Sequence, residues 1–398
     1  MSTKLVTGIS KGENASVVAR EAANMAAGKL DGSPIGLVIV YCSSKYDYQE
    51  VVNTVRAATG NAPLIGCSTG GEFTEDQVYN ESIAVGILAS DSMKFFTAMA
   101  SGLKENEMES AKKLAEALPS TVEGYPNKSA IVLIDGLAGK GEEISISIAN
   151  VLGIDTTLTG GAAGDDLAFK VTHVFCNDEV ATNAASICMI ASKSPVVVSV
   201  RHGHTPLSGD LKVTKATANV LYEVNDRPAW EVWKEEAKED AAKIGINVDE
   251  LNDASKQGAF LLRYELGVPS DDKYKVRVPL AVNEDGSLNF ACTIPQGMTF
   301  NIMKSVEEKQ IESAKEAMEL AVKNAGGAKI AGALVFDCVC RGIILGDKFA
   351  QAVDEFKKVL GAGVPVFGFE TYGEICMSAG DFTGFHNTTS VIMLLPEN

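Results

Sequence analysis

Two stretches of this sequence match one another without a gap, and they decide the fold. The first is PLIGCSTGGEF at residues 63–73, and the second is PVFGFETYGEI at residues 365–375. Both have proline first, glycine fourth, threonine seventh and Gly-Glu at the ninth and tenth positions. A match of this kind indicates an internal repeat, so the flanking sequence should define a repeating unit.

The flanks of the two stretches agree in kind. An apolar run rich in β-branched residues precedes each stretch, and such a run predicts a strand buried on both faces. A helix with apolar residues at helical spacing is expected between run and turn, and a further strand follows the turn. The expected strand, helix and final strand are 36–42, 47–58 and 80–88 in the first copy, and 332–338, 347–360 and 387–395 in the second.

A third, more diverged copy lies between these two. Its glycine turn is LTGGAAGDD at 158–166, with a strand at 130–135, a helix at 141–152 and a last strand at 183–190. The strand–helix–strand part predicts a right-handed parallel crossover, and the last strand should return antiparallel. The sequence therefore predicts an α/β fold of layered mixed sheets, built from repeated strand–helix–strand–turn–strand units in two pseudo-related halves.

The rest of the chain is expected to connect or cover these units. Helices are predicted at 12–28, 228–243 and 304–325, and a hairpin at 273–282 and 287–294 around Glu284-Asp285-Gly286. A boundary near 216–224 separates the two complete units from the remainder. We therefore expect one domain over residues 1–218 with two repeats, and a second over 219–398 with one repeat, the hairpin and the long helices.

Composition excludes several classes of protein. The 398 residues include 35 basic and 52 acidic side chains, a formal charge of −17, which argues against binding nucleic acid. No signal peptide or membrane-spanning segment is visible, so no membrane insertion is expected. The eight cysteines are scattered, and His202 and His204 could form a metal pair on one strand face, but the sequence indicates no third ligand. We expect a reduced, cytoplasmic protein without metal or cofactor.

The sequence resembles the FIST family, the F-box and intracellular signal transduction module. In the N-terminal half the resemblance rests on 8–10 (GIS), 66–72 (GCSTGGE) and 160–165 (GGAAGD), and in the C-terminal half on 220–229, 338–342 (CVCRG) and 369–374 (FETYGE). It implies an intracellular sensor of small polar metabolites, amino acids among them. Members are often fused to output domains, whereas two FIST halves fill this chain, so a separate signalling partner protein is expected.

The binding site is expected at the glycine turns and at the loops after the first strands, 42–45, 135–140 and 338–341. Ligands of parallel α/β units bind at the carboxyl ends of the strands. Arg341 could pair with a ligand carboxylate through its planar fork, and Glu72 or Glu374 could face an ammonium group. The competing interpretation is that the glycines only turn the chain and the glutamates cap it or lie in solvent. The candidate ligand-binding residues are Gly66, Cys67, Ser68, Thr69, Glu72, Asp165, Cys338, Arg341, Thr371, Tyr372 and Glu374.

Two other functions stay open. The first is an enzyme acting on the same kind of metabolite, with Cys67 as nucleophile at its glycine turn or the pair Glu72 and Glu374 as chemical groups. Against it, cysteine is often a small buried apolar residue. Residues 66–70 match G-x-S-x-G, but a nucleophile elbow needs a helix directly after the serine, and none is predicted there. The second is an assembly or scaffold protein, and a homo-oligomer is also left open.

Overall fold

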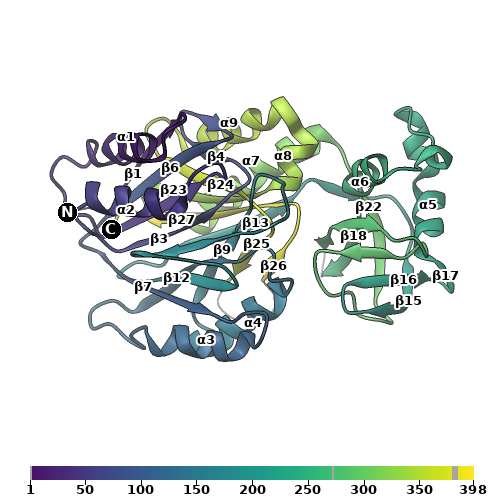
Figure 1. The fold of residues 1–398 in the computed structure, drawn as a ribbon, viewed down its shortest axis with the longest axis horizontal. Coiled ribbons are helices and arrows are strands. Elements are labelled where there is room, and N and C mark those ends of the chain that lie inside the picture. The colour runs from purple at the N-terminus through teal and green to yellow at the C-terminus, as the bar shows by residue number, and fades with distance from the viewer. Residues whose placement is uncertain (1, 271–272, 379–383) are drawn as a thin grey trace.

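The computed structural model describes residues 2–270, 273–378 and 384–398. It divides into a larger part, which we call the main body (2–202 and 306–398), and a smaller part, which we call the small lobe (204–305); Figure 1 shows them at left and right. The two ends of the chain lie side by side at the end of the main body away from the small lobe, where Thr3 N donates to Glu397 O at 2.6 Å. No helix in the described residues is long and apolar enough to cross a membrane.

The main body contains three units with the same order of elements. The first comprises β1 (Lys4–Lys11), α1 (Ala15–Ala27), β2 (Leu37–Cys42), α2 (Tyr48–Ala58), β3 (Leu64–Ser68) and β6 (Ser82–Ala89). The second comprises β7 (Met93–Ser101), α3 (Glu107–Glu116), β8 (Asn127–Ile134), α4 (Gly141–Leu152), β9 (Thr157–Ala162) and β12 (Ala184–Ser192). The third comprises β13 (Val197–His202), α7 (Glu307–Asn324), β23 (Ile330–Cys338), α9 (Phe349–Leu360), β24 (Val366–Thr371) and β27 (Thr389–Pro396).

Strand pairing within each unit follows the prediction. The two middle strands are parallel, as in β2–β3, β8–β9 and β23–β24, and the last strand returns antiparallel beside the first of them. Each unit also begins with a strand that pairs with this last strand, which was not predicted. The small lobe is an insertion in the third unit, between β13 and α7.

A short hairpin after each glycine turn leaves its own unit and extends the sheet of another. The hairpins are β4 (Glu72–Thr74) with β5 (Val78–Tyr79), β10 (Val174–Cys176) with β11 (Glu179–Ala181), and β25 (Glu374–Met377) with β26 (Phe385–His386). The hairpin of the first unit pairs with β24, that of the third with β9, and that of the second with β3. The exchange is cyclic, so the three units close into one body.

The three sheets share one central core. Tyr41, Leu133 and Phe336 come from β2, β8 and β23, and all three are fully buried in the same cluster. The opposite face of each sheet is covered by the two helices of its unit: α1 and α2, α3 and α4, and α7 and α9. This layered mixed α/β architecture of repeated units confirms the predicted fold class.

The fourth-position glycine of the repeat is required by close backbone approach. It is Gly66, Gly160 or Gly368, each in the second strand of its parallel pair. A Cβ there would lie 2.3, 1.8 and 2.5 Å from the carbonyl oxygens of Val40, Val132 and Val335, on the neighbouring strand. Real Cβ atoms do not approach backbone this closely, so the three units carry glycine for the same steric reason.

The small lobe has a sheet of its own and its own apolar core. Its elements are β14 (His204–Pro206), β15 (Leu211–Thr217), β16 (Val220–Val224), β17 (Arg227–Pro228), α5 (Ala229–Lys243), α6 (Ala254–Arg263), β18 (Tyr264–Ser270), β19 (Lys273–Arg277), β20 (Pro279–Val282), β21 (Leu288–Phe290) and β22 (Thr299–Ser305). Trp233 of α5 is fully buried and stacks on Phe300 of β22, with ring centroids 5.6 Å apart. The core of the lobe forms around this pair.

Two predictions about local structure need correction, and two helices were not predicted. The hairpin around Asp285 forms between β20 and β21, but 273–277 is a separate strand that pairs with β18. A loop was expected at 338–341, after β23. Residues 339–345 instead form helix α8 (Val339–Leu345). Helices α3 and α6 were not predicted, although Asn106 and Asp253 cap their first turns.

Candidate functional site

The three glycine turns lie together at one end of the main body and are closed by hydrogen bonds to one another. One amide of each turn donates to a carbonyl of the next: Gly70 N to Glu370 O at 3.0 Å, Gly164 N to Ser68 O at 2.9 Å and Tyr372 N to Ala162 O at 3.0 Å. These amides are therefore engaged within the protein. These three amides are not available to bind a ligand in the middle of the turn cluster.

The carboxylates of Glu72 and Glu374 are occupied by hydrogen bonds within the protein. Thr371 Oγ1 donates to Glu374 Oε1 at 2.5 Å, and Thr389 donates to Oε2 through its amide at 3.1 Å and its hydroxyl at 2.7 Å. Glu72 repeats this pattern with Thr69 and Ser82. Both glutamates are buried, and burial raises the pKa of each carboxyl to about 8. Each one connects an exchanged hairpin to the last strand of its own unit.

Arg341 lies inside the protein, not on a ligand-facing loop. It is fully buried in α8, and its Nε donates to Asp337 Oδ1 at 2.8 Å. Its Nη1 donates to Gln310 Oε1 at 2.6 Å and to Ser313 Oγ at 2.8 Å, both on α7. The prediction of a loop at 338–341 is therefore wrong: residues 339–341 begin helix α8, and Arg341 faces β23 and α7.

Gly66, Cys67 and Ser68 lie in β3 and are buried. Cys67 belongs to the central core, where burial raises the pKa of its thiol well above the usual range. A thiol that stays protonated is a poor nucleophile, so this position does not favour the enzymatic alternative. Ser68 Oγ accepts the amide of His173 at 2.9 Å, and no helix follows it directly.

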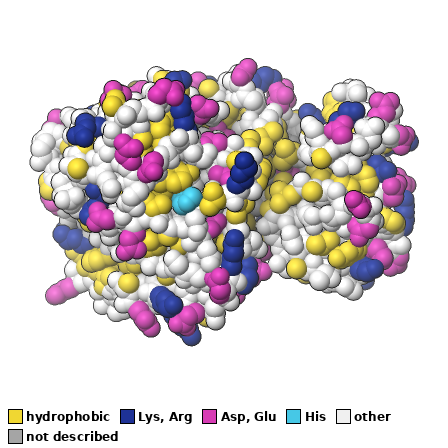
Figure 2. Space-filling model, in the orientation of Figure 1, with side chains coloured by type: hydrophobic (Ala, Val, Ile, Leu, Met, Phe, Trp, Pro, Cys, Tyr) yellow, Lys and Arg dark blue, Asp and Glu magenta, His cyan; other side chains and the backbone are white. Residues whose placement is uncertain are grey.

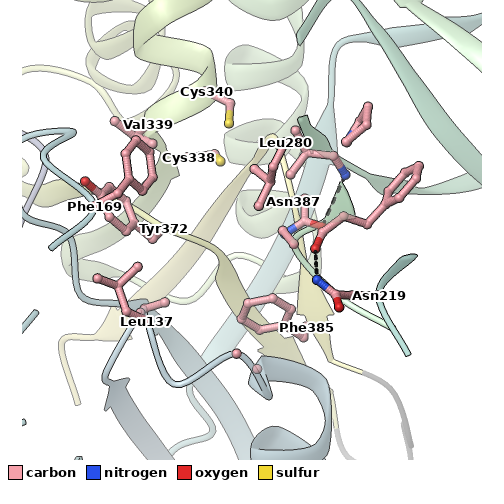
Figure 3. Close-up of a pocket in the computed structure, with 18 of the residues that line it drawn as sticks. Leu137, Phe169, Asn219, Leu280, Cys338, Val339, Cys340, Tyr372, Phe385 and Asn387 are labelled. Carbon is pink, nitrogen blue, oxygen red and sulfur yellow. Dashed lines mark hydrogen bonds between the residues drawn. The ribbon is translucent and has the colours of Figure 1, made fainter. Parts of the chain in front are cut away.

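A cavity of about 400 Å³ opens between the main body and the small lobe. Cys338 and Tyr372, two of the predicted site residues, line it. In Figure 3 the thiols of Cys338 and Cys340 lie at the α8 wall, with Leu137 and Phe385 across the space from them. The described lining residues are Ile134, Asp135, Gly136, Leu137, Gly139, Gly141, Ala162, Phe169, Cys338, Val339, Cys340, Ile343, Tyr372, Phe385 and Asn387 of the main body, and Asn219, Gly258, Leu262, Val278, Pro279, Leu280, Phe290 and Ala291 of the small lobe.

Asp165 contributes to the cavity by positioning Tyr372. The Tyr372 hydroxyl donates to Asp165 Oδ1 at 2.6 Å and accepts the amide of Leu167 at 2.8 Å. The Tyr372 ring stacks on Phe169, with centroids 4.9 Å apart. Asp165 also accepts three amides of its own loop, including Lys170 N at 2.6 Å, so the carboxylate holds the loop and the ring together.

The cavity is mainly apolar, whereas the sequence predicted a polar pocket. Asp135, Asn219 and Asn387 are its charged or amide-bearing lining side chains among the described residues. The rim is apolar too: Phe169 is 57%, Leu280 50% and Ile343 46% exposed. Figure 2 shows hydrophobic side chains gathered along the boundary between main body and small lobe. Isolated apolar side chains are ordinary at a protein surface, but a group around a cavity mouth indicates a binding site.

Two family models together match most of the chain. The FIST N domain matches residues 36–227, and the FIST C domain matches residues 229–377. This chain belongs to the FIST family. FIST domains are associated with sensory signal transduction. The boundary predicted between 218 and 219 falls at the turn from β15 to β16, inside the small lobe, and the division into 1–218 and 219–398 stays a prediction.

Other proteins are similar to this FIST protein over much of its length. An uncharacterized protein of Methanocaldococcus jannaschii is 26% identical over 355 residues, which are 82% of this chain but only 66% of that relative. Two structures of cyanuric acid hydrolase, one from A. caulinodans, align over 100% and 99% of this chain and 100% of their own chains. Their identity is 8%, and their TM-scores are 0.36 and 0.35, too low to establish a common fold.

Sequence reasoning missed the small-lobe side of this FIST cavity. Leu262, Val278 and Phe290 are ordinary apolar residues of helix and strand, and no local pattern marks them as facing another part of the protein. Asn387 did carry a signal, because asparagine precedes the last strand in all three units, at 80, 183 and 387. Asn387 Oδ1 accepts the amide of Val278 at 3.4 Å, across the boundary with the small lobe.

Proposed function

We propose that this FIST protein is a sensor that binds a small metabolite in the cavity between main body and small lobe. The observation that carries the proposal is the cavity itself, which lies beyond the carboxyl ends of β8 and β23 and is completed by an inserted lobe. Ligands of α/β sheets bind in this position, and sites between two parts of a protein are common. Its volume of about 400 Å³ is within the usual range for small-molecule sites.

Helix α8 offers a route from the cavity to the rest of the protein. Val339, Cys340 and Ile343 face the ligand space, while Arg341 of the same helix is bound to β23 and α7. A ligand that favours one position of α8 relative to the small lobe would shift the population toward that arrangement. We propose that a separate signalling protein reads this arrangement, in line with the sensory association of FIST domains.

A thermal-shift screen with a matched pair of variants tests the proposal. Gly258 lines the cavity from α6, and a Cβ there meets no heavy atom within 4 Å, so Gly258→Phe should fill the space without disturbing the fold. Ala259, the exposed next residue, gives the control Ala259→Phe. We expect one class of metabolite to raise the melting temperature of wild type and Ala259→Phe with saturation, but not that of Gly258→Phe.

Mass spectrometry of the same mixtures should recover the ligand unchanged. The proposal fails if no compound stabilises the wild type, or if a stabilising compound acts equally on Gly258→Phe. Conversion of the compound, lost in Cys67→Ala, would instead support the enzymatic alternative.

A further inference from the structure

We infer that the ligand of this cavity is an uncharged, largely apolar molecule with an aromatic or branched aliphatic body and at most one or two polar groups. This inference rests on the proposed function. It differs from the sequence-based expectation, which was a ligand carrying both a carboxylate and an ammonium group. The inference follows from the lack of available counter-charges for a charged ligand among the described lining residues. Transfer of an unpaired ion from water into an apolar site is strongly unfavourable, so a charged ligand needs an available counter-charge.

Within the part of the chain that the structure describes, the cavity offers no available cation to a carboxylate. None of its described lining residues is lysine or arginine. On the neighbouring strand β19, Arg277 donates from Nη2 to both Glu142 oxygens at 2.9 Å, and Lys275 Nζ lies 3.3 Å from the same carboxylate. Arg277 Nη1 also donates to Phe385 O at 3.0 Å. Both cations are therefore held by contacts that dock the small lobe on α4.

The carboxylate in the lining is equally engaged. Asp135 Oδ1 accepts the amide of Leu137 at 2.9 Å and the hydroxyl of Thr172 at 2.5 Å, and Oδ2 accepts the amide of Asn183 at 2.5 Å. These bonds fix the loop after β8 from three sides. An ammonium group of a ligand would have to compete with all of them, so Asp135 is a loop-positioning residue rather than a ligand carboxylate.

The start of helix α4 does not supply the missing positive charge. Gly139 and Gly141 line the cavity, and a helix N-terminus generally attracts anions. The first turn of α4 carries Glu142 and Glu143, however, and these carboxylates already lie at the positive end of the helix dipole. Glu143 would repel a further anion there, and the Glu142 carboxylate already occupies this end of the helix together with its partners Arg277 and Lys275.

The surfaces that remain suit an apolar ligand. Phe169, Tyr372 and Phe385 give aromatic contacts, and the thiols of Cys338 at the end of β23 and Cys340 of α8 line the same space (Figure 3). Leu262 of α6 completes the apolar wall. Aromatic rings pack well against such side chains.

The lining amides leave little hydrogen-bonding capacity. Asn219 Nδ2 donates to Phe290 O at 2.9 Å, while Asn387 donates to His386 O at 3.0 Å and accepts Val278 N. Asn219 keeps its Oδ1 as an acceptor and each amide keeps one N–H, which suits a ligand with one or two polar groups.

Matched compounds separate this inference from the proposed function. Indole and 4-methylphenol are neutral, tryptophan and tyrosine carry the same rings with both charges, and indole-3-acetate and tryptamine carry one charge each. Dissociation constants are measured by calorimetry and ligand-observed NMR on the full chain, as wild type, Gly258→Phe and Ala259→Phe. We expect the neutral compounds to bind at least about tenfold more tightly than their charged counterparts, with binding lost only in Gly258→Phe.

The outcomes are distinct. Tryptophan or tyrosine binding as tightly as the neutral compound, and lost in Gly258→Phe, would overturn the inference and leave the cavity as the sensing site. Failure of every compound, charged or neutral, in this and the wider screen would reject the proposed function itself.

A charge-introducing variant tests the physical reason for the selectivity. Leu280 lines the rim and is half exposed, so Leu280→Lys should fold normally and place an ammonium group at the mouth. The affinity gap between indole and indole-3-acetate should shrink several-fold in this variant, with tryptamine unimproved. An unchanged gap would contradict the explanation that the cavity rejects carboxylates for want of a counter-charge.

Discussion

Arg341 shows how a residue with a ligand-binding signature can serve the interior instead. Its guanidinium and the Asp337 carboxylate are both fully buried, and their contact is completed by two side chains of α7. No local sequence pattern distinguishes an arginine that follows a strand and binds a ligand from one that packs against a helix. The packing of α7 against α8 determines which way Arg341 faces, and its contacts in α7 lie 31 and 28 residues earlier in the chain.

Removal of this arginine should be costly. Arg341→Leu leaves the Asp337 charge buried without its cation, so we expect the free energy of unfolding to fall by about 3–5 kcal/mol. Urea unfolding followed by circular dichroism measures this. The double variant Asp337→Asn/Arg341→Leu should recover part of the loss, because the uncompensated charge is gone. A loss below about 1 kcal/mol in the single variant, as for an exposed pair, would show that the pair is not buried as described.

The buried glutamates predict a pH dependence. Burial raises the pKa of Glu374 from 4.5 to about 8, so the folded protein binds this proton more tightly than the unfolded chain. Its contribution to stability is therefore complete below about pH 4.5 and is lost as the pH rises through 8. Glu374→Gln cannot ionise, so the stability difference between wild type and this variant should decrease steadily from pH 5 to pH 8.5.

Denaturant titrations at several pH values measure that difference. The exposed Glu116→Gln serves as the matched control, and its difference from wild type should stay flat over the same range. A difference for Glu374→Gln that grows with pH would contradict the raised pKa.

At the scale of elements, the glycine in the second strand of each parallel pair decides whether that pair can form. Gly160 has φ +152°, and a Cβ there would lie 1.8 Å from Val132 O. Gly160→Ala should lower stability by at least about 3 kcal/mol or prevent folding, because β8 and β9 must separate. Gly153 also has positive φ, +95°, but open space around it, so Gly153→Ala should cost only about 1–2 kcal/mol. Thermal unfolding compares them, and equal losses would contradict the steric explanation.

The elements of the repeat were predictable because they carry local patterns. Helices α2, α4 and α9 and the strands beside them came from apolar periodicity and from the match between copies. The hairpin exchange was not predictable, since β4 and β25 look like ordinary short strands after a turn and nothing local says which sheet they join. The same limit applies to the cavity. Tyr372 and Cys338 lie in repeat motifs and could be named from the sequence as candidates, whereas Leu262 and Leu280 line the cavity only because the small lobe docks there.

At the scale of the whole molecule, a partly buried ion pair holds the small lobe against the main body. Arg277 of β19 bridges to Glu142 of α4 and to Phe385 O, beside the cavity. Arg277→Met should loosen this docking, so amide hydrogen exchange should rise at least about tenfold in β19 and β20 and at the start of α4, with little change in the core of β23. Arg227, which pairs with Glu235 on the surface of the lobe, gives the control Arg227→Met.

That control should leave exchange at the boundary unchanged, because an exposed pair contributes little. If Arg277→Met and Arg227→Met gave the same exchange pattern, the lobe would be docked by other contacts. The Arg277–Glu142 contact would then not be what fixes the small lobe beside the cavity.

The most direct test of the central claim is a crystal structure of the protein with the compound that stabilises it most in the screen. We expect its electron density between α6 and α8, in contact with Leu262, Cys340 and Phe385. Density for the compound at any other place, with the space between main body and small lobe empty or filled by side chains, would contradict the assignment of this cavity as the sensing site.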